Sequence, residues 1–119
     1  TDMTTETRLA FVVLRDLDDA DGTRHLEAEW RMGGAIVIEG RDVGPGVERF
    51  WGEGNRRYEW EWAIDAEAIP AMIAALGGAP GDDPLALLKA FYDAGDQRDP
   101  GIHLQEAGVP IEKWSSVGD

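Results

Sequence analysis

The sequence predicts an α+β domain with an antiparallel sheet of about four to five strands in its N-terminal half. Two to three short helices from the C-terminal half are expected to pack on one face of this sheet. Three observations support this: polar and apolar residues alternate up to residue 64, helical spacing follows, and Asp-Pro pairs mark helix starts. The 119 residues are the size of one domain, so we expect a single unit over 1–119 with frayed ends at 1–8 and 117–119.

The strands are expected at 9–17, 24–32, 35–39 and 58–64. The first is rich in Phe and Val, and the second and fourth alternate with period two, which is typical of half-buried strands. Short turns join the first three strands and favour a meander with one solvated face. Residues 111–116 are expected to be extended or irregular.

The segment 40–54 holds five glycines and one proline and is expected to be a long loop. It is no phosphate loop, because it lacks lysine and carries Asp42, Glu48 and Glu53, which would repel phosphate. Phe50 and Trp51 in this loop either anchor it to the core or present a contact surface.

Helical spacing begins after 65–69, a turn or 3₁₀ entry. Pro70 suits a first helical position, and Ile69 before it is biased away from helical backbone. Asp83-Pro84 and Asp99-Pro100 predict two further helix starts. The expected core consists of Leu26, Trp30, Ile36, Ile38, Trp60, Trp62, Met72, Ile73, Leu76, Leu88 and Phe91.

The charge balance limits the partners. Asp and Glu number 24 against 11 Lys and Arg, a formal net charge of −13. This excludes a nucleic-acid-binding module and a basic membrane-surface helix, and it favours a basic protein partner. Residues 65–119 hold ten acids and three bases, a net charge of −7. Helix capping and solubility also explain acids in this half, so both interpretations stay open.

The candidate partner-binding residues come from two places. The first is the acidic helical half, where Asp93 and Asp96 flank Gly95 at a helix end and oppose the helix dipole. The second is the glycine-rich segment 40–54 with its acidic and aromatic side chains. The full set is Asp93, Asp96, Asp99, Glu48, Phe50, Trp51 and Glu53.

Catalysis, metal and cofactor are not expected. The chain has no cysteine and two histidines, of which His25 lies beside Glu27 and His103 is expected at the surface. Glu59 and Glu61 share a strand face at a spacing that resembles a glycosidase pair, but solvent-facing strands commonly carry such acids. The two serines lie in no nucleophile motif. The apolar run at 9–14 is too short for a signal peptide or a membrane span, so a cytoplasmic protein is expected.

Several segments resemble an uncharacterised family of small acidic proteins of actinobacterial type. They are GRDVGPGVERFWG from Gly40, RRYEWEW, AIPAMIAALGG, DPLALLKAF and AGVPIEKWS, and the resemblance spans residues 24–116. It implies no activity and no catalytic residue. In general character the chain is also similar to immunity proteins of bacterial toxin systems.

The favoured hypothesis is therefore an immunity-type inhibitor that neutralises a basic toxin, such as a nuclease. The alternatives are a small-ligand binding protein or minor enzyme that uses the sheet face and the Trp51 loop, and a homo-oligomeric interaction module. The protein is expected to be a monomer or a homodimer.

Overall fold

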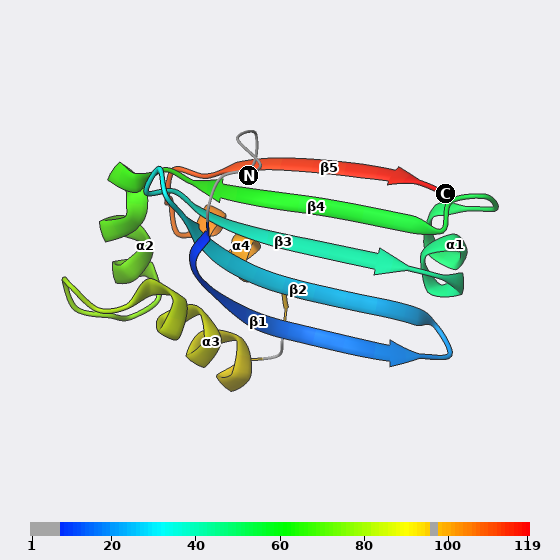
Figure 1. The fold of residues 1–119 in the computed structure, drawn as a ribbon, viewed down its shortest axis with the longest axis horizontal. Helices are drawn as coiled ribbons and strands as arrows, with labels where there is room; N and C mark the ends of the chain where they lie inside the picture. Colours follow the sequence, from blue (N-terminus) through cyan, green and yellow to red (C-terminus); the bar gives the residue numbers. More distant parts are fainter. Residues whose placement is uncertain (1–7, 96–97) are drawn as a thin grey trace.

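The computed structural model describes residues 8–95 and 98–119 and has the predicted α+β architecture. One antiparallel sheet has the strand order β1-β2-β3-β4-β5, a simple meander (Figure 1). The strands are β1 (Arg8–Asp19), β2 (Gly22–Arg31), β3 (Ile36–Val43), β4 (Arg57–Ile64) and β5 (Glu112–Gly118).

Period-two alternation divides the sheet into an apolar inner face and a charged outer face. On the inner face, Leu26 of β2 stands opposite Gly40 of β3, which stands opposite Trp60 of β4. One residue before Gly40, Glu39 stands opposite Glu27 and Glu61 on the outer face. The apolar pattern therefore fixes the register, because a shift of one residue would turn the carboxylates into the core.

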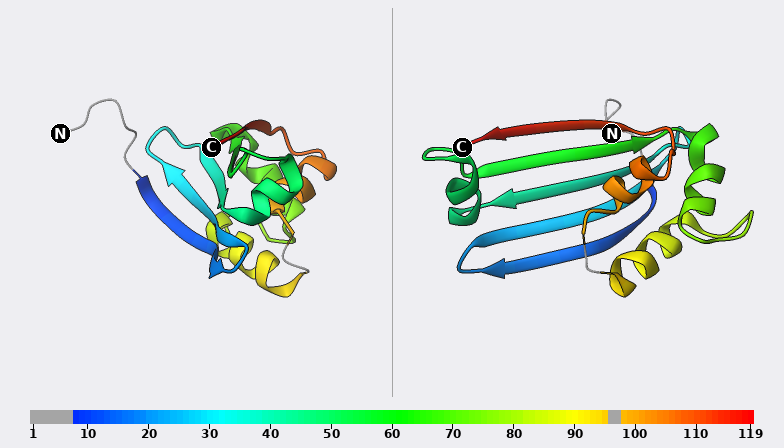
Figure 2. Two further views of the ribbon diagram at one scale, coloured as in Figure 1. Left: turned by 90° about the vertical axis from the view of Figure 1, so that its right-hand side faces the viewer. Right: turned by 180° about the vertical axis from the view of Figure 1, so that it is seen from behind.

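All the described helices lie on the inner side of the sheet (Figure 2, left). They are α1 (Pro45–Trp51), the 3₁₀ turn η1 (Ala66–Ala68), α2 (Ile69–Ala75), α3 (Pro84–Ala94) and α4 (Pro100–Glu106). From behind, α4 lies across the sheet near one end, with α2 and α3 beside it, while α1 sits over the opposite end (Figure 2, right). The inner face between α4 and α1 therefore carries no helix.

The core lies between the sheet and the helices α2, α3 and α4. Eight of the eleven expected core residues are buried: Leu26, Ile36, Ile38, Trp60, Trp62, Met72, Ile73 and Leu88. Trp30, Leu76 and Phe91 are only partly buried, since they lie at the edges of this layer. The core also contains Leu14, Leu85, Tyr92, Leu104 and Val109.

The expected loop at 40–54 is wrong. β3 continues to Val43, and α1 follows directly with Pro45 in its first turn. The buried side chain of Val47 anchors α1, and the amide of Gly46 donates to the carbonyl of Asp21 at 2.9 Å. One buried residue and a docking contact from a distant turn thus stabilise a helix that its glycine content did not suggest.

The structure also differs from three smaller expectations. Ile69 has helical backbone angles, because the preceding 3₁₀ turn continues directly into α2. His103 is partly buried rather than at the surface, since its ring packs on Phe91 and its Nε2 lies 2.9 Å from the carbonyl oxygen of Ala75. Val117 and Gly118 are paired with β4 and not frayed.

Asp99 joins the helical layer to the sheet. Its Oδ2 accepts hydrogen bonds from the indole nitrogens of Trp60, at 2.9 Å, and Trp62, at 2.8 Å. Its Oδ1 accepts from the amide of Gly101 at 2.9 Å and so caps α4. Gly101 packs so closely on Trp62 that an added Cβ would lie 2.3 Å from the indole.

None of the described helices has the length and apolar character that crossing a bilayer would require.

Replacement of Asp99 by alanine should lower the free energy of unfolding by about 2–4 kcal/mol. The lost cap of α4 costs about 1 kcal/mol, and each of the two indole N–H groups left without its acceptor costs about 0.5–1.5 kcal/mol. Denaturant unfolding measures the effect. The matched control is Asp83→Ala, which removes a cap of α3 with one hydrogen bond, to Leu85 at 3.0 Å, and should cost about 1 kcal/mol. Equal losses for the two variants would show that Asp99 acts as a cap only.

Candidate functional site

The outer face of the sheet is the candidate binding surface, because no described helix covers it (Figure 2, left). A row of side chains crosses all five strands in direct opposition: Val13, Glu27, Glu39, Glu61 and Trp114. Three glutamates are therefore cross-strand neighbours on β2, β3 and β4. Like charges in this position destabilise a sheet, since directly opposite Cβ atoms lie only about 4.5–5.5 Å apart.

The glutamate row lies in a groove of about 710 Å³. Five of the ten residues that line the groove are glutamates, against one arginine and one histidine. The glutamates are Glu27, Glu29, Glu39, Glu59 and Glu61. Trp114 borders the groove on β5 and is 54% exposed. On β1, Phe11 stands opposite Glu29 and is 55% exposed. The surface is thus an acidic floor between two exposed aromatic side chains.

Basic side chains neutralise part of this charge. Arg31 bonds Glu29 at 2.6 Å and lies 3.7 Å from Glu39, and His25 Nε2 lies 2.8 Å from Glu27. Glu59 lies between two arginines, 2.6 Å from Arg57 and 3.3 Å from Arg41. Within the described chain, no ion pair involves Glu61. The groove therefore keeps a surplus of negative charge around the centre of the row.

The pKa of Glu39 reflects this surplus. Partial burial raises the pKa of this carboxyl above its usual value, and the charges of Glu29, Glu61 and Glu27 raise it further. Arg31 opposes the shift without cancelling it. The ionised form of Glu39 is thus less favourable in the folded protein than in the unfolded chain.

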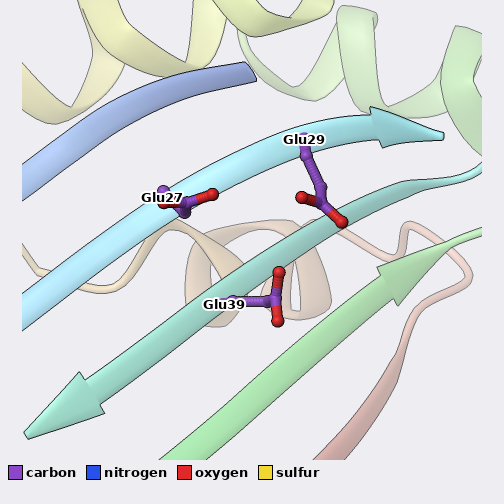
Figure 3. A group of neighbouring side chains, drawn as sticks. All are labelled: Glu27, Glu29 and Glu39. Carbon is purple, nitrogen blue, oxygen red and sulfur yellow. The ribbon is translucent and has the colours of Figure 1, made fainter. Parts of the chain in front are cut away.

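Glu27, Glu29 and Glu39 lie close together in the groove (Figure 3). One oxygen of each carboxylate lies within 4.8 Å of the others, close enough to touch one cation. Three such ligands fall short of the six to eight oxygens that Ca²⁺ takes. Arg31 already supplies a positive charge to Glu29 and Glu39, which weakens the attraction of the cluster for a metal ion.

The structure brings together part of the α1 group predicted from sequence. Phe50 is 80% exposed and its ring meets Trp51 edge-on at 5.2 Å, while Trp51 packs against Tyr58 at 5.3 Å. Glu53 is exposed in the turn after α1. Glu48 accepts a hydrogen bond from the Gly54 amide at 3.0 Å and pairs with Arg56 at 3.3 Å, and so closes this turn. The side chain of Val47 anchors this segment to the core. The rings of Phe50 and Trp51 both reach solvent, as a contact surface requires.

The acidic residues predicted on the helices are not part of the groove. Asp93 is exposed on α3 and pairs with Lys89, one helical turn earlier, at 2.9 Å. The carboxylate of Asp99 is committed to the interior by its three hydrogen bonds. Asp96 lies outside the described residues.

The structure does not bring His25 and either serine close enough together to form a catalytic pair. Ser116 stands opposite Glu59 on β5, and Ser115 stands opposite Trp60 on the other face. His25 lies three strands from Ser116, which is about 14 Å at about 4.8 Å per strand and far beyond hydrogen-bond reach. Arg57 pairs with Glu59, whereas its neighbour Arg56 pairs with Glu48.

Sequence reasoning missed the glutamate row and Trp114. The alternation over 24–32 and 58–64 did place Glu27 and Glu61 on the polar side of their strands. However, the expected third strand ends at Glu39, and residues 111–116 are expected only to be extended or irregular. The row depends on the pairing of β3 with both neighbours, which periodicity within one strand cannot give.

Replacement of Glu39 by glutamine should stabilise the protein at neutral pH by up to about 1 kcal/mol, the scale of a cross-strand charge pair. Solvent screening keeps the gain small, because the Glu39 side chain is 40% exposed. Since the folded state raises the pKa, folded protein holds this proton more tightly, and stability falls as pH rises through the shifted value. The gain in Glu39→Gln should therefore vanish below the usual value of 4.5, where Glu39 is protonated in both states.

Denaturant unfolding of both proteins between pH 4 and pH 8 measures this difference. The control Glu106→Gln removes an exposed acid on α4 that pairs with Arg98 at 3.1 Å, and should change stability by at most about 0.5 kcal/mol. Destabilisation by Glu39→Gln at pH 7 would show that attraction to Arg31 outweighs the repulsion.

Purified protein should contain no stoichiometric divalent metal. The reason is the guanidinium of Arg31 within the carboxylate cluster, together with the absence of cysteine from the chain. Elemental analysis and calorimetric titration with Ca²⁺ and Zn²⁺ check this. One equivalent of bound metal that is lost in Glu29→Gln would contradict it and assign the cluster as a metal site.

Comparisons with protein-family models, curated proteins and solved structures find no match. The resemblance to small acidic actinobacterial-type proteins stays a prediction, and the function has to be argued from the geometry of this chain.

Proposed function

We propose that this protein is a non-catalytic inhibitor of the immunity type, which neutralises a basic toxin domain in the cytoplasm. The outer face of the sheet is its binding surface. The observation that carries this proposal is the row of Glu27, Glu39 and Glu61, which are directly opposed on three adjacent strands and left uncovered by the helices.

The repulsion between these opposed glutamates destabilises the sheet, and this cost supports a functional role for the row. Alternative polar residues would solvate the same face without cross-strand repulsion, and Glu61 has no ion-pair partner among the described side chains. A cationic partner surface would supply the missing positive charge. Natural proteins commonly keep destabilising residues where binding or catalysis requires them.

The composition of the groove fits a protein partner better than a small cation. The floor is acidic, and Phe11 and Trp114 stand on its two sides with about half of their surface exposed. Exposed aromatic side chains beside complementary charge are typical of protein interfaces and their energetic centres. A nuclease toxin, whose substrate is a polyanion, presents a basic cleft that an acidic surface can fill.

Electrostatic steering gives the main test. The variant Glu39→Lys/Glu61→Lys should associate with a basic toxin nuclease domain at least about tenfold more slowly than the native protein at about 0.01 M ionic strength. At about 0.15 M the difference should shrink, because the screening length falls from about 30 to about 8 Å. Stopped-flow or surface-plasmon measurements of the on-rate at both salt concentrations provide the readout.

The matched control is Asp93→Lys/Glu106→Lys, which makes the same change of charge on exposed positions of α3 and α4. The control should slow association less than the groove variant at the low salt concentration, because its charges lie farther from the proposed contact surface. At about 0.15 M its on-rate should stay within about threefold of the native value, since the screening length is then about 8 Å. Circular dichroism checks that both variants are folded. If the control slows association while the groove variant does not, the helical acids form the binding surface, and the outer face does not.

A further inference from the structure

We propose a second site, a cleft between α1 and the inner face of the sheet that binds a neutral, planar heteroaromatic molecule of the nucleobase type. Such a ring carries a hydrogen-bond donor next to an acceptor on one edge. This inference is independent of the proposed inhibitor function, because the cleft opens on the opposite face from the glutamate row.

The residues that line the cleft come from α1 and from the strand ends of the inner face that α2, α3 and α4 leave uncovered (Figure 2, right). Its volume is about 660 Å³, and Arg24, Asp42, Trp51 and Tyr58 are among the residues that line it. Small-molecule sites have volumes of about 300–1,000 Å³, with a mostly apolar lining and a few polar groups. The cleft has this composition: aromatic rings from α1 and β4, and a charged pair from β2 and β3.

Two residues that line the cleft each carry a buried polar atom without a partner in the described chain. The atoms are Nε of Arg24 and Oδ1 of Asp42. These residues stand directly opposite each other on β2 and β3, yet neither atom finds a hydrogen bond. Leaving a buried polar group unpaired is costly, so such groups in folded proteins generally have a partner. One donor beside one acceptor is complementary to a ligand edge that offers an acceptor beside a donor.

Aromatic side chains supply the wall against which a flat ring would stack. Phe50, Trp51, Tyr58 and Trp60 follow one another at centroid distances of 5.2, 5.3 and 5.0 Å. The inner end of this series is fixed, because Trp60 donates to Asp99. The outer end is open to solvent at Phe50 and Trp51. Stacking on an aromatic side chain is favourable for every nucleobase, because each base has a flat π-face.

The charges of the cleft indicate a neutral ligand. Asp21 and Asp42 balance Arg24 and Arg49 among the lining residues. Arg49 of α1 is paired with Asp21, and Arg24 is paired with Asp19. Neither guanidinium is free for a phosphate, and the net charge of −13 repels anions. Nucleosides should therefore bind, and nucleotides should bind more weakly.

Calorimetric titration with adenosine and cytidine tests the proposal on the full chain. At least one of them should bind saturably, with Asp42 accepting from the exocyclic amine and Arg24 donating to the ring nitrogen. Purine riboside, which lacks the amine, should bind at least about tenfold more weakly than adenosine. AMP should also bind more weakly than adenosine.

Three variants make the test specific. Asp42→Asn and Trp51→Ala should each weaken binding about tenfold or more, while Trp114→Ala, which removes an equally exposed ring from the other face, should leave it unchanged. Asp42→Asn should keep or raise the melting temperature, since burial raises the pKa of this carboxyl and its ionised form is held at a cost. Loss of binding without loss of stability separates a ligand contact from a structural role.

Several results would overturn the proposal. They are no saturable binding of either nucleoside at millimolar concentration, equal binding of purine riboside, or an equal loss in Trp114→Ala. The first of these would assign the two unpaired atoms to an ordered water only. A failure here leaves the inhibitor function intact, because Glu39→Lys/Glu61→Lys should not affect nucleoside binding and Asp42→Asn should not affect association with a basic protein.

Discussion

The carboxylate of Asp99 is the constraint on which the arrangement of this fold depends. It accepts hydrogen bonds from two indoles of β4 and from the first turn of α4, and so joins the sheet to the helical layer at one point. A half-buried carboxylate with three donors is well satisfied, whereas the indole N–H groups of the two buried tryptophans would not be without it. Gly101 allows α4 to approach Trp62 directly. The helices α2, α3 and α4 therefore lie at one end of the inner face, and two other surfaces stay open.

These two open surfaces differ in chemistry because they lie on opposite sides of the same strands. The outer face concentrates like charge, which opposes folding and favours attachment of a cationic surface. The uncovered inner face balances its charges and is lined by aromatic rings, which favours a neutral flat ligand. Both surfaces keep groups that the fold alone leaves unsatisfied: Glu61 without an ion-pair partner among the described residues, and the facing atoms of Arg24 and Asp42 without a hydrogen bond there. Such local conflicts are expected where function, not stability, selects the residue.

The sequence was sufficient for the fold class and for most of the core, since periodicity and caps are local signals. Asp83-Pro84 and Asp99-Pro100 begin helices as expected, and Trp60 and Trp62 are buried. Failures occurred where a distant contact overrides local preference. The helix α1 contains glycine and proline, yet the turn at Asp21 and the burial of Val47 hold it. The second role of Asp99, as acceptor for two indoles about forty residues earlier, has no local signal. The glutamate row likewise required the pairing of three strands.

The register of β3 links all of these features. Along this strand Glu39 points outward, and Gly40 and Asp42 occupy inward positions, so alternation assigns one residue to the groove, one to the core and one to the cleft. Gly40 fixes this assignment, because the Trp60 ring fills the space of the missing side chain, and an added Cβ would lie 2.1 Å from the ring. A shift by one residue would place Glu39 or Arg41 under the indole, which the dry core does not tolerate. The contact that packs Trp60 against β3 thus also aligns Glu39 with Glu27 and Glu61, and Asp42 with Arg24. The core packing and the two candidate sites consequently have a single structural origin.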